Sequence, residues 1–477
     1  MKKVIFILMF ISLSVSFLSA QTVDDALRYA RPNGMVTART AGLGVSYHGI
    51  LDDMGALFYN PAGLALIPKT ELSVGFGYES SKTQTNYLNV LTDYPVNKGY
   101  LSNIGLITPV YGASKNAALG IGYFYESSFN GTQSFDVYNP SSSIIADESY
   151  NGPQKIKQNW AYELYLADFQ GDKLATDYKG EVQQNNFVEE TGGIHNITGG
   201  FGLELSDYLS MGMSVIGKWG SYHYYRDYRE TDKNNMHQIP ILGKELKSLQ
   251  LEQFQDSYIA GISGMIGLQG RIGKYMRAAV GVQLPTYYGF NEEYSTTYYA
   301  DYTDNTNAWW SPDSLETMAT TYSITTPFIY SAGFSANVVG LTITAGVEYC
   351  DVTQLVYKNG VSELTSVNRD IKTDLTPETK YGLGLEYQIP GIPLTVRGSY
   401  ENTTNPYVDN SPNSNYTNIA FGAGVYLGEN IRLDAVIRWS DYSTKRVNYG
   451  TFDTQYYSDY SIKNTPLNVT VGLTYRY

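Results

Sequence analysis

This sequence of 477 residues lacks several features that define common protein classes. It has one cysteine, Cys350, so no disulfide can form within the chain. After residue 20 it has no apolar run near the roughly 18 residues that a membrane-spanning helix needs. Its formal net charge of −13 offers no basic stripe for binding the phosphates of nucleic acid. These absences argue against disulfide frameworks, helical membrane proteins and nucleic-acid-binding proteins.

The first twenty residues have the layout of a cleavable signal peptide. Lys2 and Lys3 form a short positive segment, and an apolar run from Val4 to Leu18 follows. Small residues up to Ala20 then offer a cleavage site, with no cysteine after it for a lipoprotein anchor. A transmembrane anchor is the alternative interpretation, but the run is short for one. We therefore expect residues 1–20 to be a signal peptide and the mature chain to be exported.

Tyrosine and glycine are abundant in the chain. The sequence has 45 Tyr and 46 Gly, and Tyr outnumbers the 17 Phe and 5 Trp together. Transmembrane barrels carry aromatic girdles at both interfaces, where a tyrosine ring lies in the apolar zone and its hydroxyl meets water. The composition therefore favours an all-β transmembrane barrel over soluble domains.

The C-terminal residues show the alternation of a membrane strand. Apolar residues occupy every second position, at Leu467, Val469, Val471, Leu473, Tyr475 and Tyr477, with small or polar residues between them. This period over eleven residues fits one tilted strand with one face towards lipid and the other towards the lumen. The final aromatic residue resembles the signal that barrel assembly machinery recognises. We therefore expect that machinery to be a partner during biogenesis.

The same alternation recurs upstream with a regular rhythm. Strands are predicted near residues 71–80, 100–110, 117–127, 195–206, 209–221, 257–269, 276–288, 322–337, 341–351, 379–389, 394–402, 418–428, 431–443 and 467–477. Short links alternate with long ones, as expected for an even-stranded outer-membrane barrel with periplasmic turns and long outer loops. The prediction is an antiparallel transmembrane β-barrel of fourteen strands spanning residues 69–477. Trp160 to Leu166 also alternates, but we interpret it as apolar structure within the longest outer loop, since a fifteenth strand would break the rhythm.

The segment 21–68 does not show the barrel pattern. Val23 to Ala30 predicts a short helix that ends before Pro32. A Gly-rich stretch, the acidic pair Asp52 and Asp53 and the motif from Asn60 to Leu64 (NPAGL) follow it. Nothing in the segment spans lipid, so we expect it to form a plug in the lumen of the barrel.

Residues 37–78 resemble the start of mature FadL/TodX-type outer-membrane transporters of long-chain fatty acids and other hydrophobic compounds. The shared elements are Gly42 and Gly44, the acidic pair, and the Asn-Pro-Ala-Gly-Leu motif before the first strand. The chain looks like a Bacteroidetes-type member of this family. The resemblance implies a fourteen-stranded barrel with an N-terminal hatch, apolar ligand capture by outer loops, and a route that opens sideways. The extension TVDDALRYARP before the motif departs from the family pattern.

The resemblance also implies that Asn60, Pro61, Ala62 and Gly63 belong to the hatch and its junction with the first strand. Proline fixes φ, glycine allows a positive φ, and asparagine caps local turns. These residues together predict a rigid junction. Gating by this junction and a purely structural turn both remain open.

Aromatic residues gather in two of the predicted outer loops. They are Trp160, Tyr162, Tyr165 and Phe169 in the longest loop and Trp309 and Trp310 in another. Exposed apolar clusters often mark binding sites, so we interpret these residues as candidates for capturing an apolar ligand. Interfacial anchoring and packing within the loop are the alternatives.

No catalytic or metal-binding motif is present in the sequence. The four histidines, His48, His195, His223 and His237, are scattered and form no metal-binding pair. A Ser–His dyad at His195 or His223 is the one catalytic alternative. We expect no enzyme, no cofactor and no metal.

The leading hypothesis is an outer-membrane channel for passive uptake of hydrophobic small molecules, such as fatty acids. Its expected partners are that ligand, outer-membrane lipid and, during biogenesis, the assembly machinery. The alternative is a barrel scaffold that partners a protein secretion system. An open porin for polar solutes is a third possibility, and a soluble secreted sandwich protein is a remote one.

Overall fold

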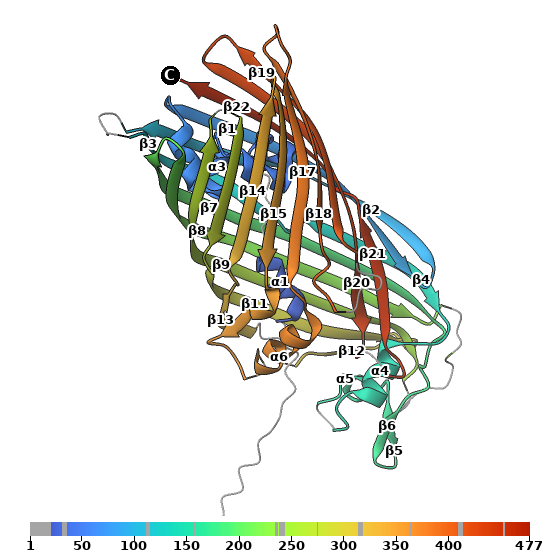
Figure 1. Cartoon of the computed structure of the whole chain (residues 1–477). Helices are drawn as coiled ribbons and strands as arrows, with labels where there is room; N and C mark the ends of the chain where they lie inside the picture. Colours follow the sequence, from blue (N-terminus) through green and yellow to red (C-terminus); the bar gives the residue numbers. More distant parts are fainter. Residues whose placement is uncertain are drawn as a thin grey trace, which may run out of the picture.

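The computed structural model describes residues 21–30, 36–110, 115–155, 158–233, 237, 244–273, 275–312, 318–362, 364–408, 414–451 and 454–477. The predicted signal peptide lies outside these residues. Figure 1 shows one tilted barrel of strands, with helices inside it and a separate group of helices at the end farthest from the C-terminus. None of the helices in the described part has the length and apolar character that a bilayer crossing requires.

The wall is a closed antiparallel sheet with fourteen strand positions, which confirms the predicted fold. Nine positions are single strands: β1 (Glu71–Tyr87), β2 (Val90–Pro109), β7 (Val182–Ser206), β8 (Leu209–Thr231), β9 (Leu246–Ile272), β17 (Glu378–Gln388), β18 (Leu394–Thr403), β19 (Tyr416–Leu427) and β20 (Ile431–Tyr449). Five positions are split: β3 and β4 (Ala117–Ser128, Gly131–Asn139), β10 and β11 (Met276–Gln283, Tyr287–Tyr302), β12, β13 and β14 (Asn307–Trp310, Met318–Thr325, Ile329–Val338), β15 and β16 (Leu341–Cys350, Val356–Lys358), and β21 and β22 (Ser458–Asn464, Leu467–Arg476).

The C-terminal strand closes the barrel. β22 pairs with β1 from Glu71 opposite Arg476 to Ser80 opposite Leu467, and with β20 on its other side. Its apolar positions, such as Val471 and Leu473, are exposed towards lipid, while Thr470 faces inwards and is buried. The alternation predicted from the sequence is therefore the alternation between lipid and lumen.

The strands on one side of the barrel are longer than the sequence predicts. β7, β8 and β9 contain 25, 23 and 27 residues, and β1 and β2 continue to a tight turn at Leu88 and Asn89. Both turn residues have positive φ, as two-residue hairpin turns require. The outer extensions do not alternate between apolar and polar residues because they lie beyond the lipid. They therefore looked like loops in the sequence.

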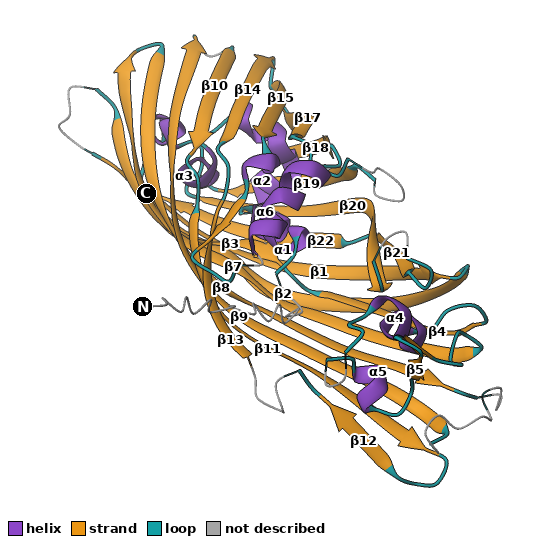
Figure 2. Cartoon of the chain, turned by 90° about the horizontal axis from the view of Figure 1, so that it is seen from below, coloured by secondary structure: helices purple, strands orange, loops and turns teal. Residues whose placement is uncertain are grey.

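Short N-terminal helices fill the lumen. They are α1 (Val23–Ala30), α2 (Ala38–Leu43), η1 (Gly44–Gly49), α3 (Gly55–Tyr59) and η2 (Pro61–Leu66). The η1 turn packs on β14, β15 and β17, η2 packs on β7, β8 and β9, and α2 packs on β18 to β20. Because they contact opposite parts of the wall, these elements lie inside the barrel, as Figure 2 also shows. The predicted luminal plug is confirmed, and so is the predicted helix from Val23 to Ala30.

Apolar side chains form three main clusters along the barrel. The first contains plug residues such as Leu51 and Leu57, together with Phe124 of the wall. The second surrounds α1 and includes α6 (Leu364–Asp374). The third forms an outer unit built by α4 (Ile144–Asn151), α5 (Trp160–Glu163), β5 (Asp168–Gln170) and β6 (Lys173–Ala175) with the outer ends of the wall strands.

Candidate functional site

Asn60 joins the plug to the wall. Its side-chain oxygen accepts a hydrogen bond from the Ala62 N–H at 3.1 Å and so caps η2, whose first residue is Pro61. Its amide nitrogen donates to the Val280 carbonyl of β10 at 2.9 Å. The predicted cap is confirmed, and the same side chain also anchors the turn to the barrel.

Glycines in the wall form a seat for this turn. Gly202, Gly212 and Gly267 lie directly opposite one another on β7, β8 and β9. A Cβ at Gly202 would lie 2.6 Å from the Pro61 carbonyl oxygen, and Cβ atoms at the other two would also collide with Pro61 or Asn60. The backbone of the plug therefore rests directly on the wall, which only glycine permits.

A second seat lies across the lumen, where η1 meets β14 and β15. Gly333 and Gly346 are register partners, and a Cβ on either would collide with the backbone of η1. The Ser335 hydroxyl donates to the Gly49 carbonyl at 2.6 Å, and Thr344 donates to the Ser46 hydroxyl at 2.7 Å. The plug is therefore held on two opposite sides of the barrel.

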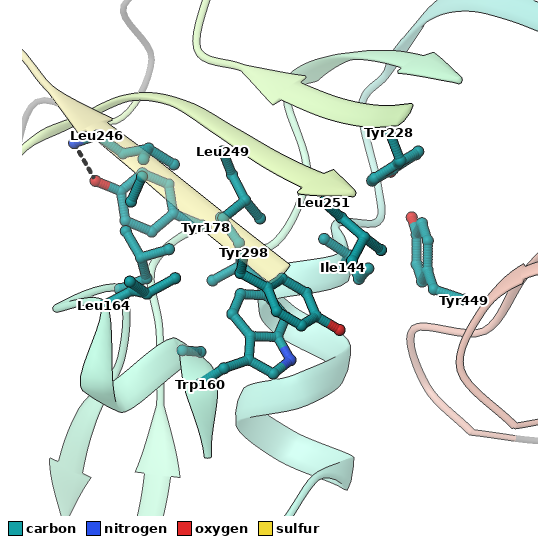
Figure 3. Packing of buried hydrophobic residues seen from close by; sticks show 14 of the residues in the cluster. Ile144, Trp160, Leu164, Tyr178, Tyr228, Leu246, Leu249, Leu251, Tyr298 and Tyr449 are labelled. Atoms are coloured by element: carbon teal, nitrogen blue, oxygen red, sulfur yellow. Dashed lines mark hydrogen bonds between the residues drawn. The ribbon is translucent and has the colours of Figure 1, made fainter. Parts of the chain in front are cut away.

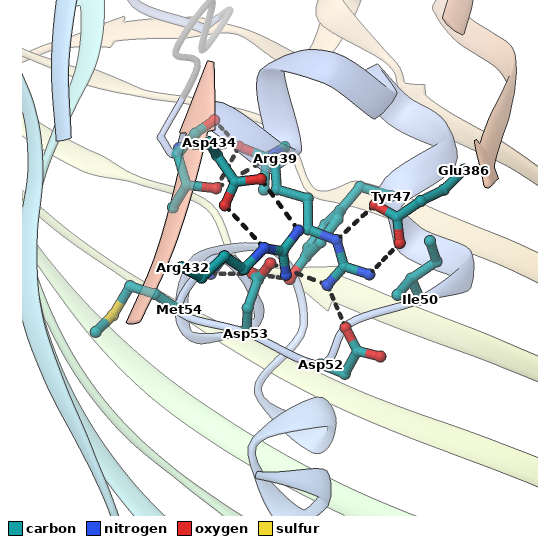
Figure 4. A network of polar contacts seen from close by, with 12 residues as sticks. Arg39, Tyr47, Ile50, Asp52, Asp53, Met54, Glu386, Arg432 and Asp434 are labelled. Atoms are coloured by element: carbon teal, nitrogen blue, oxygen red, sulfur yellow. Dashed lines mark hydrogen bonds and ion pairs between the residues drawn. The ribbon is translucent and has the colours of Figure 1, made fainter. Parts of the chain in front are cut away.

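Arg39 organises the charges between the plug and the wall (Figure 4). It forms ion pairs with Asp52, with Asp53 at 3.1 Å and with Glu386 of β17 at 2.7 Å. Arg277 of β10 pairs with Asp52 from the other side at 2.7 Å. Burial alone would raise the pKa of Asp52, but the two guanidiniums lower it well below its usual value. Asp52 and Asp53 of the acidic pair are therefore both ion-paired, and these bonds help to hold the plug against the wall. The sequence analysis did not identify Arg39, the residue that joins them.

The N-terminal extension occupies the outer half of the lumen. Arg28 of α1 pairs with Glu190 at 3.2 Å and lies over the ring of Tyr222, 3.9 Å from its centroid. Arg446 of β20 pairs with Asp24 at 2.9 Å. These bonds hold α1 across the passage between the outer unit and the rest of the plug.

A cavity of about 170 Å³ remains between α1, the plug and the wall. Five tyrosines line it: Tyr59, Tyr100, Tyr125, Tyr416 and Tyr442. Its described charged lining consists of Glu79, Glu348, Glu378 and Glu401 with Lys380 and Arg438. Lys380 pairs with Glu348 at 3.2 Å, and Arg438 pairs with Glu401 at 2.8 Å. The lining is thus aromatic and polar, with an excess of carboxylates.

Several buried polar atoms of this lining have no hydrogen-bond partner among the described residues. They are His48 Nδ1, Ser331 Oγ and Asn468 Oδ1. His48 Nε2 lies 2.8 Å from Glu348 Oε1, and since a carboxylate only accepts, Nε2–H donates. When the ring is neutral, Nδ1 is an acceptor for a ligand or for water.

The cavity reaches the wall where β2 and β3 separate. These strands pair only from Asn103 opposite Phe124 to Pro109 opposite Ala118. Farther out, β3 and β4 pair with β7 among the described strands, and β4 moves inwards so that Phe135 stacks on Tyr87 at 4.2 Å. Tyr100 and Tyr125 meet across the seam with their ring centroids 4.8 Å apart. Among the described strands, backbone pairing between β2 and β3 thus stops beside the cavity, and we call this place the seam.

The six predicted capture residues do not form one surface. Trp160 is 3% exposed and stacks on Tyr298 at 4.2 Å within the outer unit (Figure 3). Tyr162 and Phe169 are half-buried and touch each other, and Trp310 packs against the same cluster. Tyr165 and Trp309 are 43% and 48% exposed. Self-packing thus accounts for most of the group, and only these two present broad aromatic surface to the outside.

The histidines are separate from one another. His195 Nδ1 lies 2.7 Å from the Tyr123 hydroxyl, and His237 contacts the Gly180 carbonyl at 2.8 Å. His223 lies between Asp256 and Ser221 on the outer surface of the wall. In the part of the chain that the structure describes, no three His, Cys, Asp or Glu side chains are placed to bind a metal ion.

Solved structures show which known barrels share this architecture. A Pseudomonas aeruginosa FadL homologue matches 92% of this chain and 98% of its own with a TM-score of 0.57 at 11% identity. This chain has the FadL fold. The P. putida toluene transporter TodX matches with a TM-score of 0.53 at 10% identity, over 89% of this chain and 94% of its own. No protein-family model and no curated protein sequence matches the chain.

The FadL fold, with its closed wall and apolar outer face, places the chain in the outer membrane. The sequence identity to these transporters is too low to transfer residue roles.

Proposed function

We propose that this barrel carries small hydrophobic molecules passively across the outer membrane. The observation that carries the proposal is an aromatic cavity enclosed between two luminal elements and extending to a seam in the wall. Transport in either direction through a lumen closed by α1 and the plug requires one of them to move. A ligand at the seam would reach the membrane sideways, along Tyr100 and Tyr125.

The size and charge of the cavity favour a single-ring compound over a long-chain fatty acid. A cavity of about 150 Å³ holds one benzene molecule, and this one measures about 170 Å³. Four carboxylates face two cationic side chains in the described lining, so a fatty-acid carboxylate would meet repulsion. Tyrosine rings instead offer stacking surfaces to a neutral aromatic ligand.

A scaffold role in protein secretion has its own supporting observation. The outer unit is a packed domain-like cluster, and it presents Trp309 and Tyr165 to the outside. A folded surface of this kind suits a protein partner better than flexible loops would. A stable partner recovered with the barrel, together with a lack of ligand uptake, would favour this alternative.

Uptake of radiolabelled toluene and laurate tests the transport proposal. The chain is expressed in a Gram-negative host that lacks its own FadL-type transporter, and uptake is compared with the empty vector. We expect faster toluene uptake and little change for laurate. Ser331→Phe, which places a ring in the cavity, should reduce toluene uptake to the vector level.

Tyr330→Phe is the matched control, since the neighbouring side chain faces lipid and is half exposed. Heat-modifiable migration on gels verifies that each variant is folded. Toluene uptake that equals the vector, or that persists in Ser331→Phe, would contradict transport through this cavity. Preferential laurate uptake would contradict the proposed ligand class alone.

A further inference from the structure

Three polar residues meet on the outer surface of the wall, away from the lumen. Ser221 and His223 are two residues apart on β8, so their side chains leave the same face of the strand. Asp256 of β9 is the register partner of His223. Pleat and register therefore bring a hydroxyl, an imidazole and a carboxylate together on one face.

The hydrogen bonds run in the order that nucleophilic catalysis requires. His223 Nδ1 lies 2.6 Å from Asp256 Oδ1, and because the carboxylate only accepts, Nδ1–H donates. This bond leaves the lone pair of Nε2 free to act as a base. Nε2 lies 3.1 Å from the Ser221 hydroxyl, so that hydroxyl can donate its proton to the imidazole.

The three side chains are open to a substrate. The side chains of His223 and Asp256 are each 42% exposed. Ser221 lies opposite Gly193 on β7, which has no side chain, and opposite Tyr258 on β9. Ser221 is itself partly exposed, and the exposed Tyr258 ring lies beside it on the β9 side.

The position along the strand places the group at the bilayer surface. Outward-facing residues of β8 are apolar from Leu209 to Val215, then aromatic at Trp219. Ser221 and His223 follow at the next two outward positions. Since aromatic girdles mark the membrane interface, the group lies at the level of the lipid head groups and ester linkages.

We infer that Ser221, His223 and Asp256 form a serine-hydrolase site for acyl esters of membrane lipids or other lipophilic alcohols. Ser221 and His223 are the catalytic residues, and Asp256 is a positioning residue that holds the imidazole in the required tautomer. This activity is independent of the proposed transport, because the site faces away from the lumen.

The reaction proceeds in two balanced steps. Ser221 Oγ attacks the ester carbonyl and passes its proton to His223 Nε2; the carbon–oxygen bond to the alcohol breaks, and His223 protonates the leaving oxygen. Water then attacks the acyl-serine, giving its proton to His223, which returns it to Ser221 Oγ. The products are an alcohol and a carboxylic acid.

The test uses the full-length protein in detergent micelles. The probes are p-nitrophenyl laurate, phosphatidylethanolamine in mixed micelles and a fluorescent fluorophosphonate that labels activated serines. We expect turnover of both esters and labelling at Ser221, located by peptide mass spectrometry. Ser221→Ala should lose both. Ser248→Ala is the control, because Ser248 contacts the carboxylate of Asp301 at 3.4 Å but has no histidine partner among the described residues.

Asp256→Asn should lower kcat about 100-fold or more with little change in KM, and Asp256→Glu should restore part of the loss. A purely structural role of Asp256 would not separate kcat from KM in this way. The proposal is overturned if no ester is hydrolysed above buffer, or if Ser221→Ala retains turnover or labelling. All four variants change side chains on the outer surface, so heat-modifiable migration should match the parent protein.

Discussion

At the scale of single residues, the contact between the plug and the wall depends on glycines, which have no side chain. Glycine at Gly202, Gly212 and Gly267 lets the plug backbone contact the wall at a distance that a Cβ would forbid. The sequence shows these glycines only as small residues between apolar ones. Their role became visible once the plug was placed against them.

Gly202→Leu should displace η2 from its seat. The new side chain would collide with Pro61 and Leu64, and overpacking of this kind costs about 1–3 kcal/mol. The expected result is a lower midpoint of guanidinium unfolding and faster proteolysis of the plug. Gly199→Leu on the same strand is the control, since a Cβ there meets nothing within 4 Å. Equal behaviour of the two variants would argue against the seat.

Glu148 should make the outer unit sensitive to pH. Burial, together with the neighbouring Asp147, raises the pKa of its carboxyl from 4.5 to about 8, although bonds from Trp160 oppose the shift. Above pH 4.5 the unfolded state loses this proton more readily than the folded state does. The stability of the unit should therefore be greatest below about pH 4.5 and fall as the pH rises towards 8.

Limited proteolysis between pH 4.5 and 8 measures this dependence, with cleavage mapped to the outer unit by mass spectrometry. Glu148→Gln should remove most of the pH dependence and protect the unit at the higher pH. Gln170→Asn on the exposed end of β5 in the same unit should leave the dependence intact. A steep dependence that persists in Glu148→Gln would show that another group titrates.

At the scale of elements, the plug is a set of short helices fixed at two opposite seats. The family resemblance implies that such a hatch moves, and any such movement must release a seat and the Arg39 ion pairs. The order of elements in the plug could be predicted from the sequence because its helix, Gly-rich stretch and Asn-Pro turn have local signals. Most partners of these elements in the wall lie more than a hundred residues away, so local signals could not predict them.

A reversible crosslink separates a moving plug from a fixed one. The hydroxyls of Ser46 on η1 and Thr344 on β15 are 2.7 Å apart, so thiols placed at the same two positions would lie close to each other. In a Cys350→Ala background, Ser46→Cys with Thr344→Cys should slow toluene uptake when oxidised and recover on reduction. The single Ser46→Cys variant is the control. Unchanged uptake in the oxidised form would show that η1 stays on its seat during transport.

At the scale of the whole molecule, the filled lumen opposes an open porin. Helix α1 closes the outer half, and the remaining plug closes the periplasmic half beside the short turns. At the seam between β2 and β3 the rings of Tyr100 and Tyr125 meet. Under the transport proposal a small ligand would leave there, by a path that ions in the lumen do not share. We therefore expect the plug to limit the conductance of the barrel.

Planar bilayers should show little steady conductance for the mature chain. A variant lacking residues 21–66 but keeping the leader should give large, stable steps, because only the polar inner wall remains. A variant lacking residues 21–30 should show an intermediate effect, since the periplasmic half stays filled. Large steps from the intact chain would contradict a sealed lumen and restore the porin hypothesis.

The sequence by itself determined the class of the molecule. Alternation of period two, the spacing of turns and the abundance of tyrosine predicted fourteen antiparallel strands, because lipid on one face and lumen on the other impose that pattern on each strand. The NPAGL motif and the helix from Val23 to Ala30 are likewise local features. The ends of the strands were not predictable, because no such pattern is imposed beyond the lipid.

Only the tertiary structure decided which residues act together. The cavity takes side chains from α1, η1, α3 and at least eight strands, and Arg39 meets Glu386 across 347 positions of the chain. Trp160 was an exposed candidate in the sequence, and packing against Tyr298 buries it. Ser221 and His223 are neighbours by strand periodicity, but Asp256 joins them only through the register of β8 with β9. Register is decided by the closure of the whole barrel, and for that reason no single segment encodes it.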